Sequence, residues 1–155
     1  MAITREEIDL QELFRDLGKI CKTEAVCQKC ADRACLVGYA KDCAAQCRIK
    51  KQTFVAGGFQ EIPEVDIRGG YDEYDVLHGI AHILLQCRSC KKDHYEECIL
   101  NVIRSCMEII EFGDNQDYEG DVLSYLMKMK SLHEEKASII ASEYSEAKEK
   151  KLSSN

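Results

Sequence analysis

The sequence predicts an all-α protein, a helical bundle with an N-terminal cysteine-rich lobe that bound metal staples together. Three observations favour this fold class. Apolar residues recur at helical spacing over most of the chain, there is a single proline, and six of the ten cysteines fall between residues 21 and 47. At 155 residues, the chain has the length of one domain with a sizeable core.

The first part of the chain, residues 1–51, is expected to contain one helix followed by the cysteine-rich lobe. The helix spans residues 4–21, because Thr4 and Glu7 have the spacing of a capping box and apolar residues follow at helical intervals. The polar residues of this helix, Asp16 among them, are expected to face solvent.

The rest of the chain divides into a linker and a bundle, and all parts are expected to form one compact domain. Residues 52–71 hold two Gly pairs and the only proline, which is typical of an ordered linker or a small extended hairpin. Residues 72–150 are expected to form three antiparallel helices, over residues 72–87, from Asp93 to Phe112 before Gly113, and from Asp117 or Asp121 through Tyr144. Beyond Tyr144 the Glu/Lys-rich sequence is expected to fray.

The high cysteine content needs a chemical explanation. No apolar run approaches the length of a membrane span, and the first ten residues lack the apolar region of a signal peptide. We therefore expect a cytoplasmic protein without membrane contact. Thiols stay reduced in the cytoplasm, so metal ligation, with zinc as the expected ion, is the favoured role for paired cysteines.

The strongest zinc spacing lies in the cysteine-rich lobe and has the form Cys-x2-Cys-x12-Cys-x3-Cys, formed by Cys27, Cys30, Cys43 and Cys47. Residues 39–51 are compatible with a helix that places the last two thiols one turn apart on one face. Cys21 and Cys35 are substitute ligands. An iron–sulfur cluster is the alternative cofactor, although no Cys-x2-Cys-x2-Cys run is present.

A second zinc set is predicted where two helices of the bundle meet, and it consists of Cys87, Cys90, His94 and Cys98. His94 and Cys98 would share a face in the first turns of the second helix. The connecting loops are tight for four ligands, so the alternative is that Cys98 is a core residue and His94 is exposed. A further alternative joins both Cys-x-x-Cys pairs in one site, made of Cys27, Cys30, Cys87 and Cys90.

His78 and His82 lie four residues apart in an expected helix and are further substitute metal ligands. A metalloprotease would have glutamate directly after the first histidine, where this chain has Gly79, so the pattern argues against that enzyme class. The favoured interpretation is that both histidines are hydrogen-bonded or surface residues, and that Gly79 permits close approach of another helix.

Charge is unevenly distributed along the chain. The formal net charge of −7 argues against a general binder of nucleic acid or anionic membranes. Residues 19–51 nevertheless carry eight Lys or Arg against three acidic residues, and the candidates for contact with nucleic-acid phosphate are Lys41, Arg48, Lys50 and Lys51. Few aromatic residues lie nearby for base stacking, so a solvated basic face is favoured over a nucleic-acid site.

These patterns together predict a small cytoplasmic metal-binding protein. Structural zinc would support a non-enzymatic interaction or regulatory module whose partner is another protein. The alternatives are a redox protein or enzyme with an iron–sulfur cluster or an open metal position, and a zinc-stabilised nucleic-acid-binding protein that uses residues 19–51.

Overall fold

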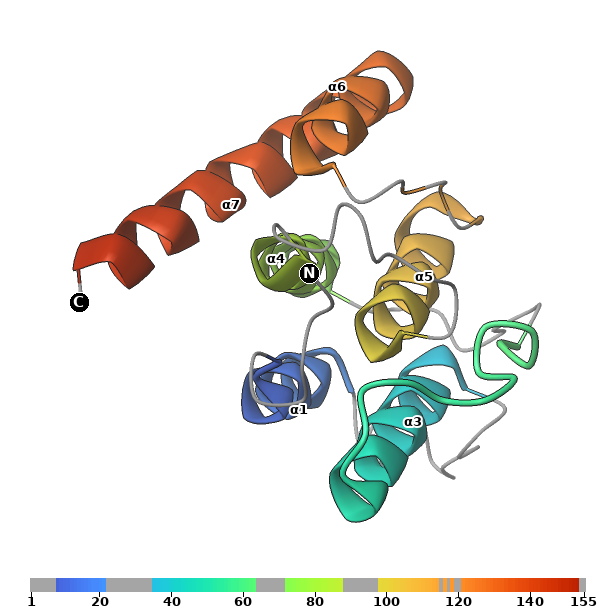
Figure 1. The fold of residues 1–155 in the computed structure, drawn as a ribbon. Helices are drawn as coiled ribbons and strands as arrows, with labels where there is room; N and C mark the ends of the chain where they lie inside the picture. The colour runs from blue at the N-terminus through green and yellow to red at the C-terminus, as the bar shows by residue number, and fades with distance from the viewer. Residues whose placement is uncertain are drawn as a thin grey trace.

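The computed structural model describes residues 8–21, 35–63, 72–87, 98–114, 116, 118 and 121–153. These residues contain six α-helices (Figure 1), namely α1 (Leu10–Ile20), α3 (Leu36–Lys50), α4 (Glu73–Cys87), α5 (Ile99–Phe112), α6 (Val122–Leu132) and α7 (Glu134–Ser153). The one extended pairing in this part of the chain is an isolated antiparallel bridge between Phe54 and Cys98. The predicted all-α fold class is confirmed for the described residues.

Four helices form a closed ring around a shared core. Helix α1 packs on α3, α3 on α5, α5 on α4, and α4 on α1. Helix α7 lies against the outer side of α4 and continues beyond the ring, and α6 packs on α7 (Figure 1). Buried side chains from residues 8–55 and from residues 76–140 belong to one hydrophobic cluster, so the cysteine-rich part and the bundle part pack as one body.

The first two helices differ from the prediction at their starts. Helix α1 begins at Leu10, where the Asp9 side chain accepts a hydrogen bond from Glu12 N at 3.0 Å. The predicted start after Thr4 is wrong because residues 8 and 9 precede the helix, and the proposed capping box lies outside the described residues. Helix α3 begins earlier than residue 39 and buries Cys43 and Cys47, one turn apart, as predicted.

Helix α5 ends at the predicted residue but begins later in the chain than predicted. Gly113 adopts the left-handed conformation at φ 85° and donates its N–H to Ile109 O, which closes the last turn. Cys98 is the N-cap and precedes the first helical residue, Ile99. Cys98 is buried, which agrees with the alternative that it is a core residue, whereas His94 lies outside the described residues.

The predicted last helix is two helices separated by His133. The backbone of His133 leaves the helical region, with φ −143° and ψ 73°. Its N–H donates to Met129 O at 2.7 Å and ends α6, while its carbonyl accepts from Ala137 N at 2.8 Å and starts α7. The imidazole packs 4.5 Å from the Phe112 ring, measured between centroids. Because no Gly or Pro marks this break, the apolar pattern alone predicts one continuous helix.

Residues 52–63, the part of the predicted linker that the structure describes, form turns, and residues 64–71 lie outside the described residues. Gly57 has a φ of +72°, and a Cβ at Gly58 would lie 2.9 Å from Val55 Cβ, so both glycines are required by the local backbone. The Tyr39 hydroxyl of α3 donates a hydrogen bond to Gly58 O and anchors this turn to the core. None of the described helices combines the length and the apolar character that a bilayer span needs.

Arg104 and Glu108 form a buried ion pair within α5, and further partners of this pair come from α6 and from the segment before it. Arg104 Nε donates to Glu108 Oε2 at 3.1 Å, and the Tyr125 hydroxyl donates to the same oxygen at 2.6 Å. Gln116 N donates to Glu108 Oε1 at 2.9 Å. The Arg104 guanidinium also lies 4.7 Å from the centroid of the Tyr118 ring. Three donors thus offset the cost of burying the Glu108 carboxylate.

Candidate metal centre

A row of polar side chains one turn apart runs along α4, which is otherwise largely apolar, and it consists of Tyr74, His78, His82 and Gln86. Every member of this polar row contacts a residue far away in the sequence. Tyr74 and His78 contact α7, His82 contacts α1, and Gln86 bonds to the backbone of Asp9 at the start of α1. The polar row therefore connects α4 to two helices from opposite ends of the chain.

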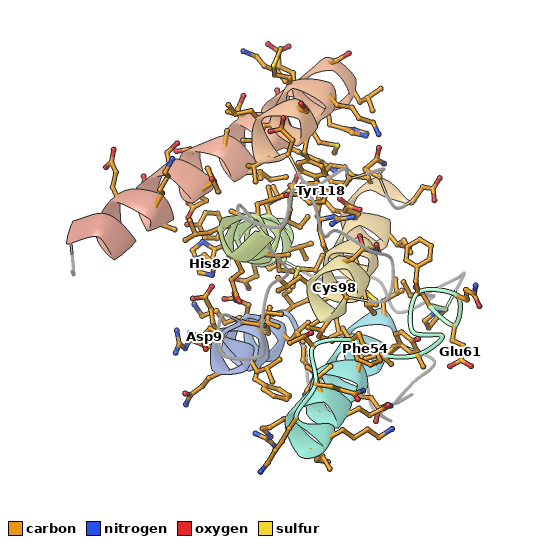
Figure 2. All side chains as sticks on the ribbon, viewed as in Figure 1. Asp9, Phe54, Glu61, His82, Cys98 and Tyr118 are labelled. Carbon is orange, nitrogen blue, oxygen red and sulfur yellow. The ribbon has the colours of Figure 1, made fainter. Side chains whose placement is uncertain are left out.

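His82 faces α1, and Figure 2 shows it on the side of α4 toward that helix. Its Nδ1 lies 2.8 Å from Asp16 Oδ2 and 3.9 Å from Glu12 Oε1. The hydrogen bond with Asp16 raises the pKa of His82, and this effect exceeds the opposing effect of burial. The carboxylate thus favours a cation at this imidazole, and a metal ion bound there would displace the proton.

Asp16 is the most deeply buried member of the cluster, with 2% of its side chain exposed. The prediction that it faces solvent is wrong, because α4 and its histidine cover this part of α1. Its second oxygen, Oδ1, is buried and has no hydrogen-bond partner in the described part of the chain. A buried carboxylate oxygen without a donor is costly, and a bound cation is one way to remove that cost.

His78 faces α7. Its Nδ1 lies 2.7 Å from Glu143 Oε2, and the Tyr74 hydroxyl donates to Glu143 Oε1 at 2.7 Å. The hydrogen bond from Tyr74, followed by the contact with His78, lowers the pKa of Glu143. The ring centroids of His78 and His82 are 4.1 Å apart with the planes steeply inclined, so the two imidazoles lie in direct contact.

Asp16, His78 and His82 each offer one ligand atom, and these three atoms lie within 4.8 Å of one another. This is the one group of its kind among the described residues. Ligand atoms on a tetrahedral zinc ion with bonds of about 2.1 Å are about 3.4 Å apart, so small side-chain movements would close the site on an ion. The side chains of His78 and His82 are 23% and 19% exposed, which leaves the cluster open to solvent on one side.

Sequence reasoning found only the two histidines of this cluster. Asp16 lies on a different helix, and the (i, i+4) pair Glu12 and Asp16 has the appearance of an ordinary polar face. The polar row is the feature of the sequence that could have indicated the cluster. Four polar residues spaced one turn apart on a largely apolar helix need hydrogen-bond partners from other elements.

The structure brings three predicted thiol ligands into one neighbourhood at the junction of α3 and α5. Cys47 Sγ hydrogen-bonds to Phe54 O at 3.6 Å, and Phe54 pairs with Cys98 in the isolated bridge (Figure 2). Burial, with smaller contributions from Cys43 and Cys98, raises the pKa of Cys47 to about 12. The three side chains are buried, and their sulfur atoms are not among the described groups at ligand spacing.

The other predicted metal ligands fall into two groups. Those that lie outside the described residues are Cys27, Cys30, Cys90 and His94, together with the side chain of Cys87. The substitute ligands Cys21 and Cys35 are half-buried. Zinc or an iron–sulfur cluster on the thiols stays a prediction.

The predicted phosphate-binding residues lie on α3 and at its end. Lys41 is half-buried, and Arg48, Lys50 and Lys51 are exposed. The Arg48 guanidinium lies 4.8 Å from the centroid of the Phe14 ring of α1, so part of this side chain packs within the protein. Positive charge in the last turn of α3 is also favourable toward the helix dipole.

No protein-family model matches the chain, and neither a curated protein nor a solved structure matches it.

Proposed function

We propose that this protein binds one divalent transition-metal ion at the cluster of Asp16, His78 and His82, with zinc as the first ion to test. The observation that carries the proposal is the convergence of three ligand atoms within 4.8 Å beside a buried carboxylate oxygen that lacks a hydrogen-bond partner among the described residues. Imidazole and carboxylate are ligand types that zinc uses in proteins.

The number of ligands supports an ion with an open coordination position rather than a closed structural zinc. Structural zinc sites have four protein ligands, whereas sites that bind water or substrate have three. The same donor set of two histidines and one carboxylate also binds Fe²⁺ in other proteins, so iron is the alternative ion. The partial exposure of both imidazoles supports access of the ion from solvent.

The test compares zinc binding by wild type and by variants of the full chain, because the ten cysteines also have affinity for zinc. Zinc affinity and stoichiometry are measured by competition with a chromogenic chelator. We expect His78→Ala and His82→Ala each to weaken one zinc site by more than about 100-fold, since loss of an outer partner of a zinc ligand already costs about 10–100-fold.

The matched control is His133→Ala, which removes the histidine between α6 and α7 and leaves the cluster intact. It should bind zinc as wild type does. Co²⁺ provides a second readout, because a site built from nitrogen and oxygen lacks the near-ultraviolet charge-transfer absorption of cobalt thiolates. Equal zinc stoichiometry and affinity in wild type, His78→Ala and His82→Ala would refute the proposal.

Thiol-bound zinc that staples the cysteine-rich part is the second proposal, and the observation that favours it is the shared neighbourhood of Cys43, Cys47 and Cys98. A metal ion would have to draw the three sulfur atoms together and displace their protons. Cobalt charge-transfer absorption that is lost in Cys47→Ser and retained in Cys106→Ser is the expected result. Absence of thiolate absorption in the cobalt-loaded wild type would exclude this second site.

A further inference from the structure

The C-terminal helix α7 contacts the proposed site through the carboxylate of Glu143. This helix packs on α4. Its buried apolar residues are Ala137 and Ile140, and Tyr144 is half-buried. Beyond that residue its sequence is polar, and the ribbon extends past the four-helix ring (Figure 1). Helices α4 and α7 form the most extensively packed helix pair in the described part of the chain, and Lys136 of α7 also pairs with Glu111 Oε1 at 2.8 Å. The hydrogen bonds of Glu143 add a polar contact near the middle of α7 to this interface.

Glu143 joins two side chains of the polar row with one carboxylate. Its Oε2 lies 2.7 Å from His78 Nδ1, and its Oε1 accepts from the Tyr74 hydroxyl at 2.7 Å. The Glu143 side chain is 14% exposed, so its contact with His78 is partly shielded from water, whereas Tyr74 is an exposed residue. A carboxylate held on both oxygens defines the orientation of the His78 ring relative to α7.

This geometry is the one that carboxylates adopt behind histidine ligands of metals. A metal-bound imidazole commonly donates its other N–H to a carboxylate, which fixes the ring and makes the ligand nitrogen more basic. With Nδ1 of His78 directed to Glu143, the Nε2 atom is the one available to an ion. A cation on that nitrogen makes the opposite N–H a stronger donor, and it therefore strengthens the contact with Glu143.

We infer that Glu143 couples metal binding to the docking of α7 on α4, so that the occupied site holds the C-terminal helix in place. This inference rests on the proposed metal site, and it assigns Glu143 as a positioning residue rather than a ligand. Linkage requires the two effects to be equal. The factor by which the Glu143 contact tightens metal binding is also the factor by which the metal favours α7 docking.

The experiment measures hydrogen exchange of the α7 amides in the full-length protein with and without saturating Zn²⁺, alongside zinc affinity. In wild type, Zn²⁺ should slow exchange in residues 137–147 by about 10–100-fold, the range that an outer carboxylate contributes to metal affinity. Glu143→Gln should lower zinc affinity by the same factor and abolish the slowing, as should His78→Ala.

Glu135→Gln is the matched control, because it removes the same charge from an exposed position about two turns before Glu143 in α7. It should change neither affinity nor exchange. Tyr74→Phe keeps the ring that stacks on His78 and removes the hydroxyl that Glu143 accepts from, so it should lose part of the coupling even if Glu143→Gln disturbs the metal-free helix.

The possible failures are distinguishable. If Zn²⁺ binds at the histidines but α7 exchange does not change, or if Glu143→Gln binds Zn²⁺ as tightly as wild type, the coupling is refuted and the metal site stands. If His78→Ala and His82→Ala bind Zn²⁺ as wild type does, the proposed function itself fails.

Discussion

Asp16 and Glu108 are carboxylates buried in the described part of this protein, and they are accommodated in different ways. Glu108 accepts hydrogen bonds from Arg104, Tyr125 and Gln116, so both of its oxygens have donors. Asp16 has one contact, with His82, and its Oδ1 remains without a partner among the described residues. The hydrogen-bonding capacity of Glu108 is used without a ligand, whereas Asp16 Oδ1 would gain a partner from a bound cation. We therefore regard Glu108 as part of a structural ion pair and Asp16 as part of a candidate site.

Arg104→Met should destabilise the protein by about 3–5 kcal/mol at pH 7, because it leaves a buried carboxylate without its cation. Burial already raises the pKa of Glu108, although Arg104 opposes that shift, so the variant should raise this pKa further. A raised folded-state pKa means that the folded protein binds more protons than the unfolded chain, and stability then falls as pH rises. Urea unfolding at pH 5 and pH 7.5 should show a larger loss at the higher pH.

The control for this variant is Lys136→Met. Lys136 Nζ lies 2.8 Å from Glu111 Oε1, but its side chain is 34% exposed, so the pair is screened by solvent. Its loss should cost less than about 1 kcal/mol. Equal losses for the two variants, or a loss for Arg104→Met that does not depend on pH, would contradict the assignment of Arg104 and Glu108 as a buried pair.

Cys47 should be unreactive toward iodoacetamide in the folded, metal-free protein. Its pKa is raised to about 12 and its side chain is fully buried. At pH 8 the reactive thiolate is therefore scarce and the reagent cannot reach the sulfur. Burial also raises the pKa of Cys106. Peptide mass spectrometry after labelling should find both thiols modified only after unfolding, with the half-buried Cys21 reacting sooner. Rapid native labelling of Cys47 would show that the α3–α5 junction opens.

At the level of elements, Gly79 in α4 and Gly58 in the turn after α3 should differ in how well they tolerate substitution by alanine. A Cβ on Gly79 would lie 2.9 Å from Met107 Cε, which is the flexible end of a side chain. A Cβ on Gly58 would lie 3.0 Å from the backbone oxygen of Val55. The Gly79 contact agrees with the predicted close approach of another helix at this position, here α5.

Gly79→Ala should therefore change stability by less than about 1 kcal/mol, because Met107 can move and alanine is favoured within a helix by about 1 kcal/mol. Gly58→Ala should destabilise by about 1–3 kcal/mol, because the turn backbone has to shift. Thermal and urea unfolding of the two variants, measured in parallel, give the comparison. A larger loss for Gly79→Ala would mean that Met107 is held rigidly against α4.

For the whole molecule, the candidate site links helices that are far apart in the sequence. Asp16 comes from α1, the two histidines from α4, and the supporting Glu143 from α7. An ion bound by the folded protein alone should therefore stabilise the entire structure. At a free Zn²⁺ concentration of 100 times Kd, the free energy of unfolding should rise by about 2.7 kcal/mol.

For a domain of this size, that gain corresponds to an increase in Tm of about 5–10 °C. Differential scanning calorimetry with Zn²⁺ and with excess chelator measures the change. The increase should disappear in a His78→Ala/His82→Ala double variant and persist in His133→Ala. An unchanged Tm in wild type with Zn²⁺ would exclude tight binding to the folded state.

Local periodicity and capping are enough to predict the all-α class, the position of α4, the end of α5, the one-turn spacing of Cys43 and Cys47, and the histidine pair. Tertiary structure alone decided the break at His133 and the burial of Asp16. It also decided which histidine meets which carboxylate. Such contacts join residues more than sixty positions apart, and local patterns carry no information on which helix faces will meet.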